Sequence, residues 1–363
     1  MPIVDPERYR TMLRAAADGG WAVPSVNVTS STTANAVLAG LAAAESDGII
    51  GIGLGGARFA AGRPGDEALG AEALAAFVHV VADRYPINVA IHTDHCPPDR
   101  WDAVVGPLLA VTRARVAAGQ LPLFQSHMFD GSHLPLAHNL ARSVALRDEL
   151  AALGVVLELE IGLVGGEEDG IDNRDVAAER MYTTPGDMVA VVDALGPGDD
   201  SLVAAAFGNI HGIEPRADVV LDPEVLARGQ DAIARAHGPD ARLLLVFHGG
   251  SGAAPSDVRQ AVANGVVKMN VDTDTQYAYT AAVVERLATD RDRVLGGRGR
   301  PADKTAFEQR AWMAHGEAAM ADRVVEACRV LGSGGPAHGP PAGGPAGPGP
   351  EAVGGGAGGA GGP

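Results

Sequence analysis

The stretch Asn88-Val89-Ala90-Ile91-His92-Thr93-Asp94-His95 decides the fold, and it also shows where the chemistry lies. It begins as a short apolar run without regular alternation, which is typical of a strand buried on both faces in a parallel sheet. It ends in polar residues, and the segment Trp101–Ala118 that follows has apolar residues at helical spacing. The stretch therefore predicts a strand and a helix, with polar side chains at the carboxyl end of the strand.

Units of this kind recur along most of the chain. The predicted strands are Ala22–Val28, Gly48–Gly53, Asn88–His92, Leu123–His127, Val155–Ile161, Leu202–Phe207, Leu243–Phe247 and Val266–Asn270. The predicted helices between them are Thr32–Glu45, Asp66–Arg84, Trp101–Ala118, Leu140–Leu153, Pro185–Leu195, Pro223–His237, Ser256–Asn264 and Thr275–Ala288. Gly and Pro residues mark the joins. Further helices are predicted at Pro6–Asp18 and Glu308–Val330.

Eight such units predict an α/β fold, a (β/α)8 TIM barrel with additional N- and C-terminal helices, as a single domain over residues 1–331. A doubly wound sheet is the main alternative that the pattern alone leaves open. Residues 332–363 contain 15 Gly and 7 Pro in 32 positions and almost nothing apolar larger than Ala. Such a segment cannot bury enough surface to offset its ordering entropy, so we predict a disordered tail.

The composition excludes several classes of partner. The formal charge of −17 argues against nucleic acid and anionic membranes, because both need clustered Lys and Arg. A small phosphorylated ligand stays possible, since it needs only a local site. No apolar run reaches the roughly 20 residues of a membrane span. The start of the chain lacks an apolar signal segment, and two cysteines are too few for a disulfide framework. These features predict a cytoplasmic protein.

Polar side chains follow nearly every predicted strand, and in a barrel these strand ends converge on one face. Three histidines, His95, His211 and His248, follow three different strands. Three neutral imidazoles that leave one position open are a catalytic zinc arrangement. A single histidine at such a position is more often a hydrogen-bonded residue near the core. Three histidines in phase with the strands favour a metal site.

Carboxylates lie at the same predicted rim. Asp130 and Glu160 are oxygen ligands for a second divalent ion or for another position of the first, unless they are structural carboxylates. Glu158 lies on the same strand face as Glu160 and is predicted to point deeper, where it is either functional or a core ion-pair partner. The acidic loop Gly165–Gly170 suits a base that swings over a bound substrate, although a solvated acidic turn is an equal reading.

Two segments after the last two strands are suited to an anion. His248-Gly249-Gly250-Ser251-Gly252 precedes one helix, and Asn270-Val271-Asp272-Thr273 opens another. Backbone N–H groups at glycines and helix starts favour phosphate, and barrels often bind phosphate at these two loops. A metal beside a phosphate site predicts Lewis-acid aldol chemistry or isomerisation. A Schiff base at Lys268 is the alternative, which the histidine set makes redundant.

At these residues the sequence resembles the class II fructose-bisphosphate aldolases, which are zinc-dependent (β/α)8 enzymes. The matching strings cover most of residues 20–330 in the family's order. They are His92–Cys96, Ser126–Met128 with Asp130, Leu157–Gly162, Gly165–Gly170, Phe207–Asn209 with His211 and Gly212, Phe247–Gly252, Val267–Asn270 and Asp272–Gln276. The resemblance implies reversible cleavage of fructose 1,6-bisphosphate to dihydroxyacetone phosphate and glyceraldehyde 3-phosphate through a metal-stabilised enediolate, in glycolysis and gluconeogenesis.

The resemblance also implies a role for each site residue. Asp94 would move the proton at the aldehyde-derived hydroxyl, and Glu168 would take the C–H proton of dihydroxyacetone phosphate. The implied zinc ligands are His95, His211 and His248, and the implied second metal position is Asp130 with Glu160. The implied substrate contacts are Asn27, Gly212, Gly249, Gly250, Ser251, Asn270, Asp272, Thr273 and Arg310, the last reaching into a neighbouring subunit. The implied partners are a monovalent cation, Na⁺ or K⁺, near the carbonyls of Ile210, Gly212, Gly249 and Ser251, and a second copy in a homodimer or larger homo-oligomer.

The chain departs from the family pattern at a few positions. Gly53-Leu54 stands where the family has a substrate-contacting serine, and Arg58 soon after is a candidate replacement donor. Ile213–Arg216 replaces an aromatic-Lys-Pro segment, and Phe307-Glu308-Gln309 replaces Tyr-Asp-Pro before Arg310. These changes leave two alternatives open. One is an aldolase that joins dihydroxyacetone phosphate to a different aldehyde, of tagatose type or in a specialised pathway, and the other is an inactive barrel that serves as a binding partner.

Overall fold

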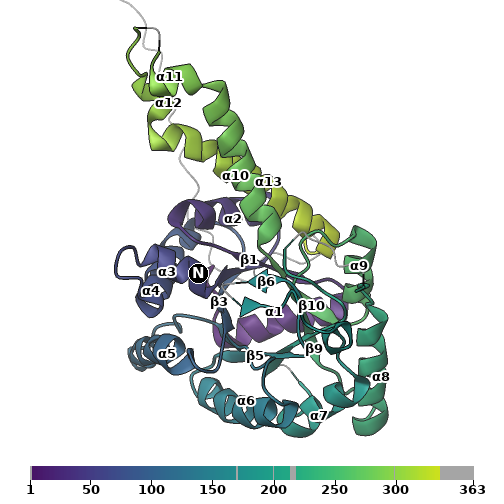
Figure 1. Ribbon diagram of the computed structural model, residues 1–363. Coiled ribbons are helices and arrows are strands. Elements are labelled where there is room, and N and C mark those ends of the chain that lie inside the picture. The colour runs from purple at the N-terminus through teal and green to yellow at the C-terminus, as the bar shows by residue number, and fades with distance from the viewer. Residues whose placement is uncertain (1, 169–170, 199, 213–217, 298, 336–363) are drawn as a thin grey trace, which may run out of the picture.

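A closed barrel of eight parallel strands forms the body of the protein (Figure 1). The computed structural model describes residues 2–168, 171–198, 200–212, 218–297 and 299–335. Around the barrel the strands follow the order β1, β10, β9, β8, β5, β4, β3 and β2. Strand β1 pairs with β2 on one side and with β10 on the other, for example Ser25 with Ile49 and Val23 with Lys268. This closure confirms the predicted barrel and excludes a doubly wound sheet.

The observed elements follow the predicted ones closely. The barrel strands are β1 Val23–Asn27, β2 Gly48–Ile52, β3 Val89–Cys96, β4 Ser126–Phe129, β5 Val156–Ile161, β8 Ser201–Ala205, β9 Leu244–Phe247 and β10 Val266–Val271. The helices are α1 Pro6–Gly19, α2 Ser31–Ala43, α3 Leu54–Ala60, α4 Glu67–Val81, α5 Trp101–Ala117, α6 Leu136–Ala151, α7 Pro185–Leu195, α8 Glu224–His237, α9 Pro255–Ala263, α10 Thr273–Thr289, α11 Arg291–Leu295, α12 Lys304–Phe307 and α13 Gln309–Leu331. A hairpin of β6 Glu167–Glu168 and β7 Ile171–Asp172 and the short 3-10 turns Ala82–Arg84 and Ala178–Met181 complete the described elements.

Strand side chains point alternately outward, toward the helices, and inward, toward the barrel axis. Outward-facing side chains such as Ile50 and Ile91 pack against the surrounding helices. Inward-facing side chains near the strand starts, among them Ile49 and Val156, pack against α1. Helix α1 therefore fills the amino-terminal end of the barrel, which leaves the carboxyl ends of the strands as the accessible mouth.

The last four helices form an arm that extends beyond the barrel (Figure 1). Helices α10 and α13 pack along each other, with an ion pair of 2.7 Å between Asp274 and Arg323, and α11 and α12 lie at the tip of the arm. The sequence predicted Thr275–Ala288 as an ordinary barrel helix. Within the described part of α10, however, only Thr275 is buried, because the helix leaves the barrel after its first turn.

The described residues continue past residue 331, where the sequence predicts the end of the domain. Gly332 ends α13 in a left-handed conformation, and Ser333 is buried. The Ser46 hydroxyl donates to the Ser333 hydroxyl at 2.9 Å, and the Gly335 N–H donates to the carbonyl of Ala44 at 3.1 Å. Residues 332–335 are thus fastened to the end of α2. The rest of the predicted tail, 336–363, lies outside the described residues. Of the helices that the structure describes, none has both the length and the apolar character needed to cross a membrane.

Candidate metal and substrate site

Strand β3 carries two site residues that are adjacent in sequence, Asp94 and His95. In a regular strand their side chains would point to opposite faces. Here Thr93 pairs with His127 and Cys96 with Phe129, so three steps along β3 match two along β4. This bulge and the left-handed conformation of His95, with φ of 36°, turn both side chains toward the mouth of the barrel. Strain of this kind is frequent at functional sites.

Asp94 is buried and accepts hydrogen bonds from residues of β1 and β10, two strands that lie next to each other in the barrel. The side-chain amides of Asn27, from β1, and Asn270, from β10, each donate to one of its carboxylate oxygens at 2.8 Å. Gly51 on β2 makes this possible, because a Cβ there would lie 2.0 Å from the Asn27 Oδ1. Burial raises the pKa of Asp94, but the neighbouring His95 and His92 bring that pKa well below its usual value. Asp94 is therefore ionised, as a carboxylate, near neutral pH.

The three predicted histidines converge at the mouth of the barrel. The ring centres of His95 and His248 lie 4.6 Å apart, those of His95 and His211 lie 5.2 Å apart, and those of His211 and His248 lie 6.5 Å apart. His95 and His248 are buried, and His211 is partly exposed. The structure thus brings together three side chains that span more than 150 positions of the sequence, from His95 to His248.

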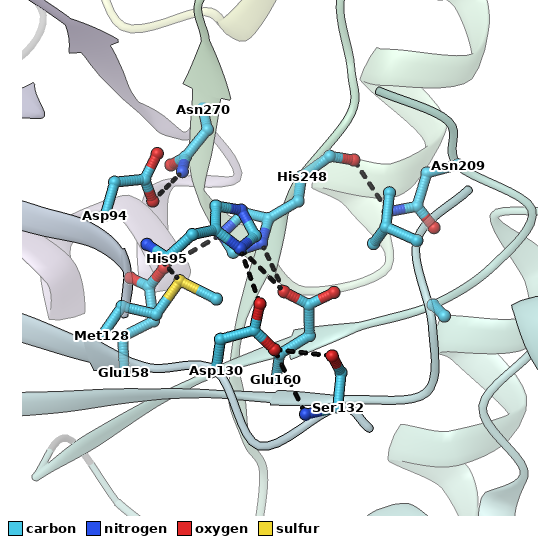
Figure 2. A network of polar contacts seen from close by, with 12 residues as sticks. Asp94, His95, Met128, Asp130, Ser132, Glu158, Glu160, Asn209, His248 and Asn270 are labelled. Atoms are coloured by element: carbon cyan, nitrogen blue, oxygen red, sulfur yellow. Dashed lines mark hydrogen bonds and ion pairs between the residues drawn. The ribbon is translucent and has the colours of Figure 1, made fainter. Parts of the chain in front are cut away.

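Two carboxylates complete this cluster, as Figure 2 shows. The Asp130 Oδ2 lies 3.1 Å from the Nδ1 of His95, and the Glu160 Oε2 lies 3.1 Å from the Nδ1 of His248. Ligand atoms of His95, Asp130 and Glu160 lie within 4.8 Å of one another, and so do those of Asp94, His95 and His248. Among the described residues, His211 falls outside these tight groups and stands at their edge. Imidazole nitrogens and carboxylate oxygens at this spacing are a donor set that suits zinc or a similar divalent ion.

Glu158 lies deeper in the barrel, as predicted, and is a core ion-pair partner. Its two oxygens lie 2.9 and 2.8 Å from the Nζ of Lys268, and all three side chains of Glu158, Lys268 and His248 are fully buried. The Glu158 Oε1 also lies 3.0 Å from the Nε2 of His248. Burial raises the pKa of Glu158, but Lys268 and His92 bring it well below its usual value. Glu158 therefore accepts a hydrogen bond from His248 and fixes the orientation of that ring.

The predicted anion-binding residues lie at the ends of β9 and β10. Gly249, Gly250 and Ser251 form the turn between β9 and α9, and Asp272 and Thr273 begin α10. Gly249 has a left-handed φ of 61°, and a Cβ on it would lie 2.7 Å from the carbonyl of Ile210. The turn therefore packs closely on the loop that carries His211 and Gly212.

Two predicted residues are not part of this cluster. Glu168 belongs to β6, in the segment that follows β5. A backbone hydrogen bond connects this segment to the loop that carries His211, because the His211 N–H donates to the Gly165 carbonyl at 2.8 Å. Arg310 lies at the start of α13 on the arm, where its exposed side chain pairs with Glu308. The departure at Ile213–Arg216 lies outside the described residues.

Several residues that support the cluster were not predicted from the sequence. Ser132 donates to the Asp130 Oδ1 from its backbone N–H, at 3.2 Å, and from its hydroxyl. Asn139 donates to the carbonyl of Glu160 at 2.8 Å, and Asn209 donates to the carbonyl of His248 at 2.7 Å. Of these, only Asn209 stands at a predicted strand end. Asn139 lies on a helix, where nothing in the pattern separates it from a surface residue.

A closed parallel barrel with histidines and carboxylates gathered at its carboxyl rim defines a (β/α)8 enzyme with a metal-type centre. Comparison with known proteins then gives the family. Residues 7–336 match the family described as "Fructose-bisphosphate aldolase class-II", so the chain belongs to the class II fructose-bisphosphate aldolases and is an aldolase, a lyase. This confirms the resemblance inferred from the sequence.

Individual relatives agree with this assignment. The chain is 48% identical to the fructose-bisphosphate aldolase of Streptomyces galbus over 338 residues, which cover 92% of this chain and 99% of that protein. It is 48% identical to the enzyme of the same name from Mycobacterium tuberculosis, with 91% and 97% covered. The crystal structure of the fructose-bisphosphate aldolase from Campylobacter jejuni superposes with a TM-score of 0.81 at 35% identity, covering 92% of this chain and 96% of that one.

Proposed function

We propose that the protein is a zinc-dependent aldolase that reversibly cleaves fructose 1,6-bisphosphate to dihydroxyacetone phosphate and glyceraldehyde 3-phosphate. The observation that carries the proposal is the convergence of His95, His248 and His211 beside Asp130 and Glu160, at the mouth of a barrel that belongs to this family. The names of the relatives support the substrate.

The residues present fit a divalent metal ion. His95, His211 and His248 would hold zinc, and Asp130 with Glu160 would provide a second position. The Nδ1 atoms of His95 and His248 already face carboxylate oxygens at 3.1 Å, so these groups meet in one small buried space. When bound, the ion acts as a Lewis acid that polarises the ketone oxygen of the substrate.

The chain's own residues would handle the protons and the substrate. Asp94, held as a carboxylate by Asn27 and Asn270, would accept the proton of the substrate's C4 hydroxyl as the carbon–carbon bond breaks. Glu168 on the β6–β7 hairpin would exchange the C–H proton of dihydroxyacetone phosphate. The substrate contacts would be Asn27, Gly212, Gly249, Gly250, Ser251, Asn270, Asp272 and Thr273, with the phosphate on the N–H groups after β9 and β10.

Two further partners belong to this proposal. A monovalent cation would sit near the carbonyls of Ile210, Gly212, Gly249 and Ser251, and the close approach of Gly249 to Ile210 supports this. A homodimer or larger homo-oligomer would place Arg310 of one copy at the substrate of another. The exposed position of Arg310 on the projecting arm supports this arrangement. We expect the enzyme to work in the cytoplasm, in glycolysis and gluconeogenesis.

The second candidate function is an aldolase that joins dihydroxyacetone phosphate to another aldehyde. Gly53 supports it, because the position directly after β2 at the barrel mouth offers no side-chain donor. Cleavage of fructose 1,6-bisphosphate, tagatose 1,6-bisphosphate and fructose 1-phosphate by the same preparation separates the two functions. A strong preference for fructose 1,6-bisphosphate would remove this second candidate.

The main test is the cleavage of fructose 1,6-bisphosphate by the purified full-length protein with metal removed and restored. We expect EDTA to abolish cleavage and added zinc to restore it. We also expect His211→Ala to lose bound zinc and activity together. Cleavage that persists in the metal-free protein would refute the mechanism. A folded, zinc-loaded protein that cleaves none of the ketose phosphates would instead favour an inactive barrel that serves as a binding partner.

A further inference from the structure

A cavity of about 680 Å³ opens beside the metal cluster, on the side of β2, β3 and β4. It is lined by His95 and Asp130 from the cluster and by Arg58, Asp99 and Arg100 from the loops and helices after β2 and β3. This volume lies within the range of small-molecule sites. One continuous cavity thus joins the metal cluster to two arginines that the mechanism above does not use.

One buried carboxylate holds both arginines. The Glu67 Oε1 accepts hydrogen bonds from the Nε of Arg58, at 3.1 Å, and from its Nη2, and the Glu67 Oε2 accepts from the Nη2 of Arg100. The Glu67 side chain is only 4% exposed, whereas the side chains of Arg58 and Arg100 are 60% and 38% exposed. Glu67 therefore anchors two guanidinium groups whose other sides remain open to the cavity and to solvent.

This arrangement offers hydrogen-bond donors for an oxyanion. A guanidinium has five N–H groups in a planar fork that matches phosphate and carboxylate. In the hydrogen bonds between described residues, Arg58 uses two of its nitrogens and Arg100 uses one. Two cations share the single charge of Glu67, which leaves one net positive charge. Asp99 also lines the cavity, but it is exposed at the rim, where solvent screens it.

The barrel order places this cavity opposite the anion-binding turn. In the circle of eight strands, β3 is four strands away from β9, which precedes Gly249–Ser251. A substrate with one phosphate on the turn after β9 and its ketone at the metal cluster would extend toward β3 if it continued across the mouth of the barrel. Its other end would then enter the cavity that Arg58 and Arg100 line.

We propose that Arg58 and Arg100, anchored by Glu67, form a subsite for the anionic group on the aldehyde-derived half of the substrate. This rests on the proposed aldolase function and adds to it the chain's own donors for the far end of the substrate. The chemical class is an aldehyde that carries a phosphate or a carboxylate. Binding through two arginine forks determines specificity at this end of the cavity and leaves the chemistry at the metal unchanged.

The test compares cleavage of fructose 1,6-bisphosphate with cleavage of fructose 1-phosphate, which lacks the second phosphate, by the full-length zinc-loaded protein. For Arg58→Met and Arg100→Met, we expect kcat/KM for the bisphosphate to fall roughly 10- to 100-fold, because each variant loses charged hydrogen bonds. Cleavage of fructose 1-phosphate should change less than about twofold. Arg63→Met, in the exposed loop after α3, is the matched control and should leave both values unchanged.

Three further arms make the result decisive. Equal losses on both substrates, or no loss on either, would overturn the subsite. Arg58→Lys keeps the charge without the fork, so it should keep the wild-type melting temperature and lose part of the preference for the bisphosphate. Condensation of dihydroxyacetone phosphate with glyceraldehyde 3-phosphate or with succinic semialdehyde separates phosphate from carboxylate. If the wild-type protein cleaves neither sugar, the proposed function fails, and calorimetric binding of glyceraldehyde 3-phosphate to wild type and Arg58→Met still decides the subsite.

Discussion

A substitution at Asp94 can distinguish a residue needed for catalysis from one needed for metal binding. Its carboxylate is held by Asn27 and Asn270, and the role of proton acceptor that we propose for it needs a negative charge that an amide lacks. We expect Asp94→Asn to lower kcat by roughly 10²- to 10⁴-fold and to keep the bound zinc, since His95, His211 and His248 are intact. Zinc analysis of the purified variant beside steady-state kinetics checks both parts. A variant that loses its zinc would show that Asp94 is instead needed for the metal.

His127 shows how a histidine near the site is used in the core. Its ring packs near the rings of Trp101 and Phe124, and its Nδ1 lies 2.7 Å from the Thr93 hydroxyl. Burial lowers the pKa of His127 to about 3. The unfolded chain therefore takes up a proton near pH 6.5, whereas the folded chain does not until about pH 3. Stability from this group is present above pH 6.5 and is lost as the pH falls through that window, by at most about 1.4 kcal/mol per pH unit.

Replacing His127 by Gln should flatten this part of the stability profile. The free energy of unfolding, measured by urea titration between pH 4 and 7, should fall less steeply with acid in His127→Gln than in the wild-type protein. His138→Gln, at an exposed position on α6, is the control and should keep the wild-type slope. Identical slopes for all three proteins would mean that His127 is not a neutral core residue.

At the residue scale, the sequence predicts the ligand-type side chains but not their supports. His95, Asp130 and Glu160 were predicted because each stands at the end of a predicted strand or just after one, and parallel strands bring their ends together. Ser132 and Asn139 were not predicted, because no sequence pattern distinguishes a serine in a turn or an asparagine on a helix from a surface residue. Their importance follows from the Asp130 and Glu160 oxygens that they contact, and those contacts exist only in the folded barrel.

At the element scale, Lys268 on β10 crosses the barrel interior to Glu158 on β5. It balances the charge of a buried carboxylate that in turn orients His248. We expect Lys268→Met to destabilise the protein by roughly 3–5 kcal/mol, because it leaves a buried charge without its partner. Urea unfolding measures this. We also expect roughly 10- to 100-fold weaker zinc binding, measured by competition with a chromogenic chelator.

The double variant Lys268→Met with Glu158→Gln separates these two effects. It removes both charges, so the stability should largely return. Zinc binding should remain weaker than in the wild-type protein, because Gln accepts a weaker hydrogen bond from His248. If the double variant restores zinc affinity fully, then charge balance alone matters and the orientation of His248 by Glu158 does not.

Most elements were predictable because each barrel strand is a short apolar run that ends at polar residues. The ends were not. Strand β3 was predicted to stop at His92 but continues to Cys96, since a bulge lets polar residues remain in the strand. Helix α3 was not predicted, because Leu54–Ala60 is short and has two glycines, Gly55 and Gly56, in its first turn. Bulges and short helices depend on tertiary pairing rather than on local periodicity.

At the scale of the whole molecule, the sequence predicts the barrel but not the arm. Helix α10 has the composition of a barrel helix, yet Tyr277 and Val284 on it are exposed. A periodic pattern shows that a helix has an apolar face, but not which surface that face meets. We expect the arm to mediate the proposed homodimer, so light scattering of the wild-type protein should give at least twice the chain mass. Replacing Tyr277 and Val284 by Glu should shift the protein toward the monomer while leaving the folded barrel intact.

Truncations on either side of residues 332–335 test where the folded domain ends. A stop after Leu331 removes the Ser333 hydroxyl bonded to Ser46 and the Gly335 N–H bonded to Ala44, and it exposes the end of α2. Two such bonds contribute on the order of 1–3 kcal/mol, so this truncation should lower the melting temperature by several degrees. A stop after Gly335 keeps both bonds and should match the full-length protein in melting temperature and kcat. If the two truncations melt alike, residues 332–335 add nothing to the fold, and if both fall well below the full-length protein, the segment after Gly335 packs on the barrel.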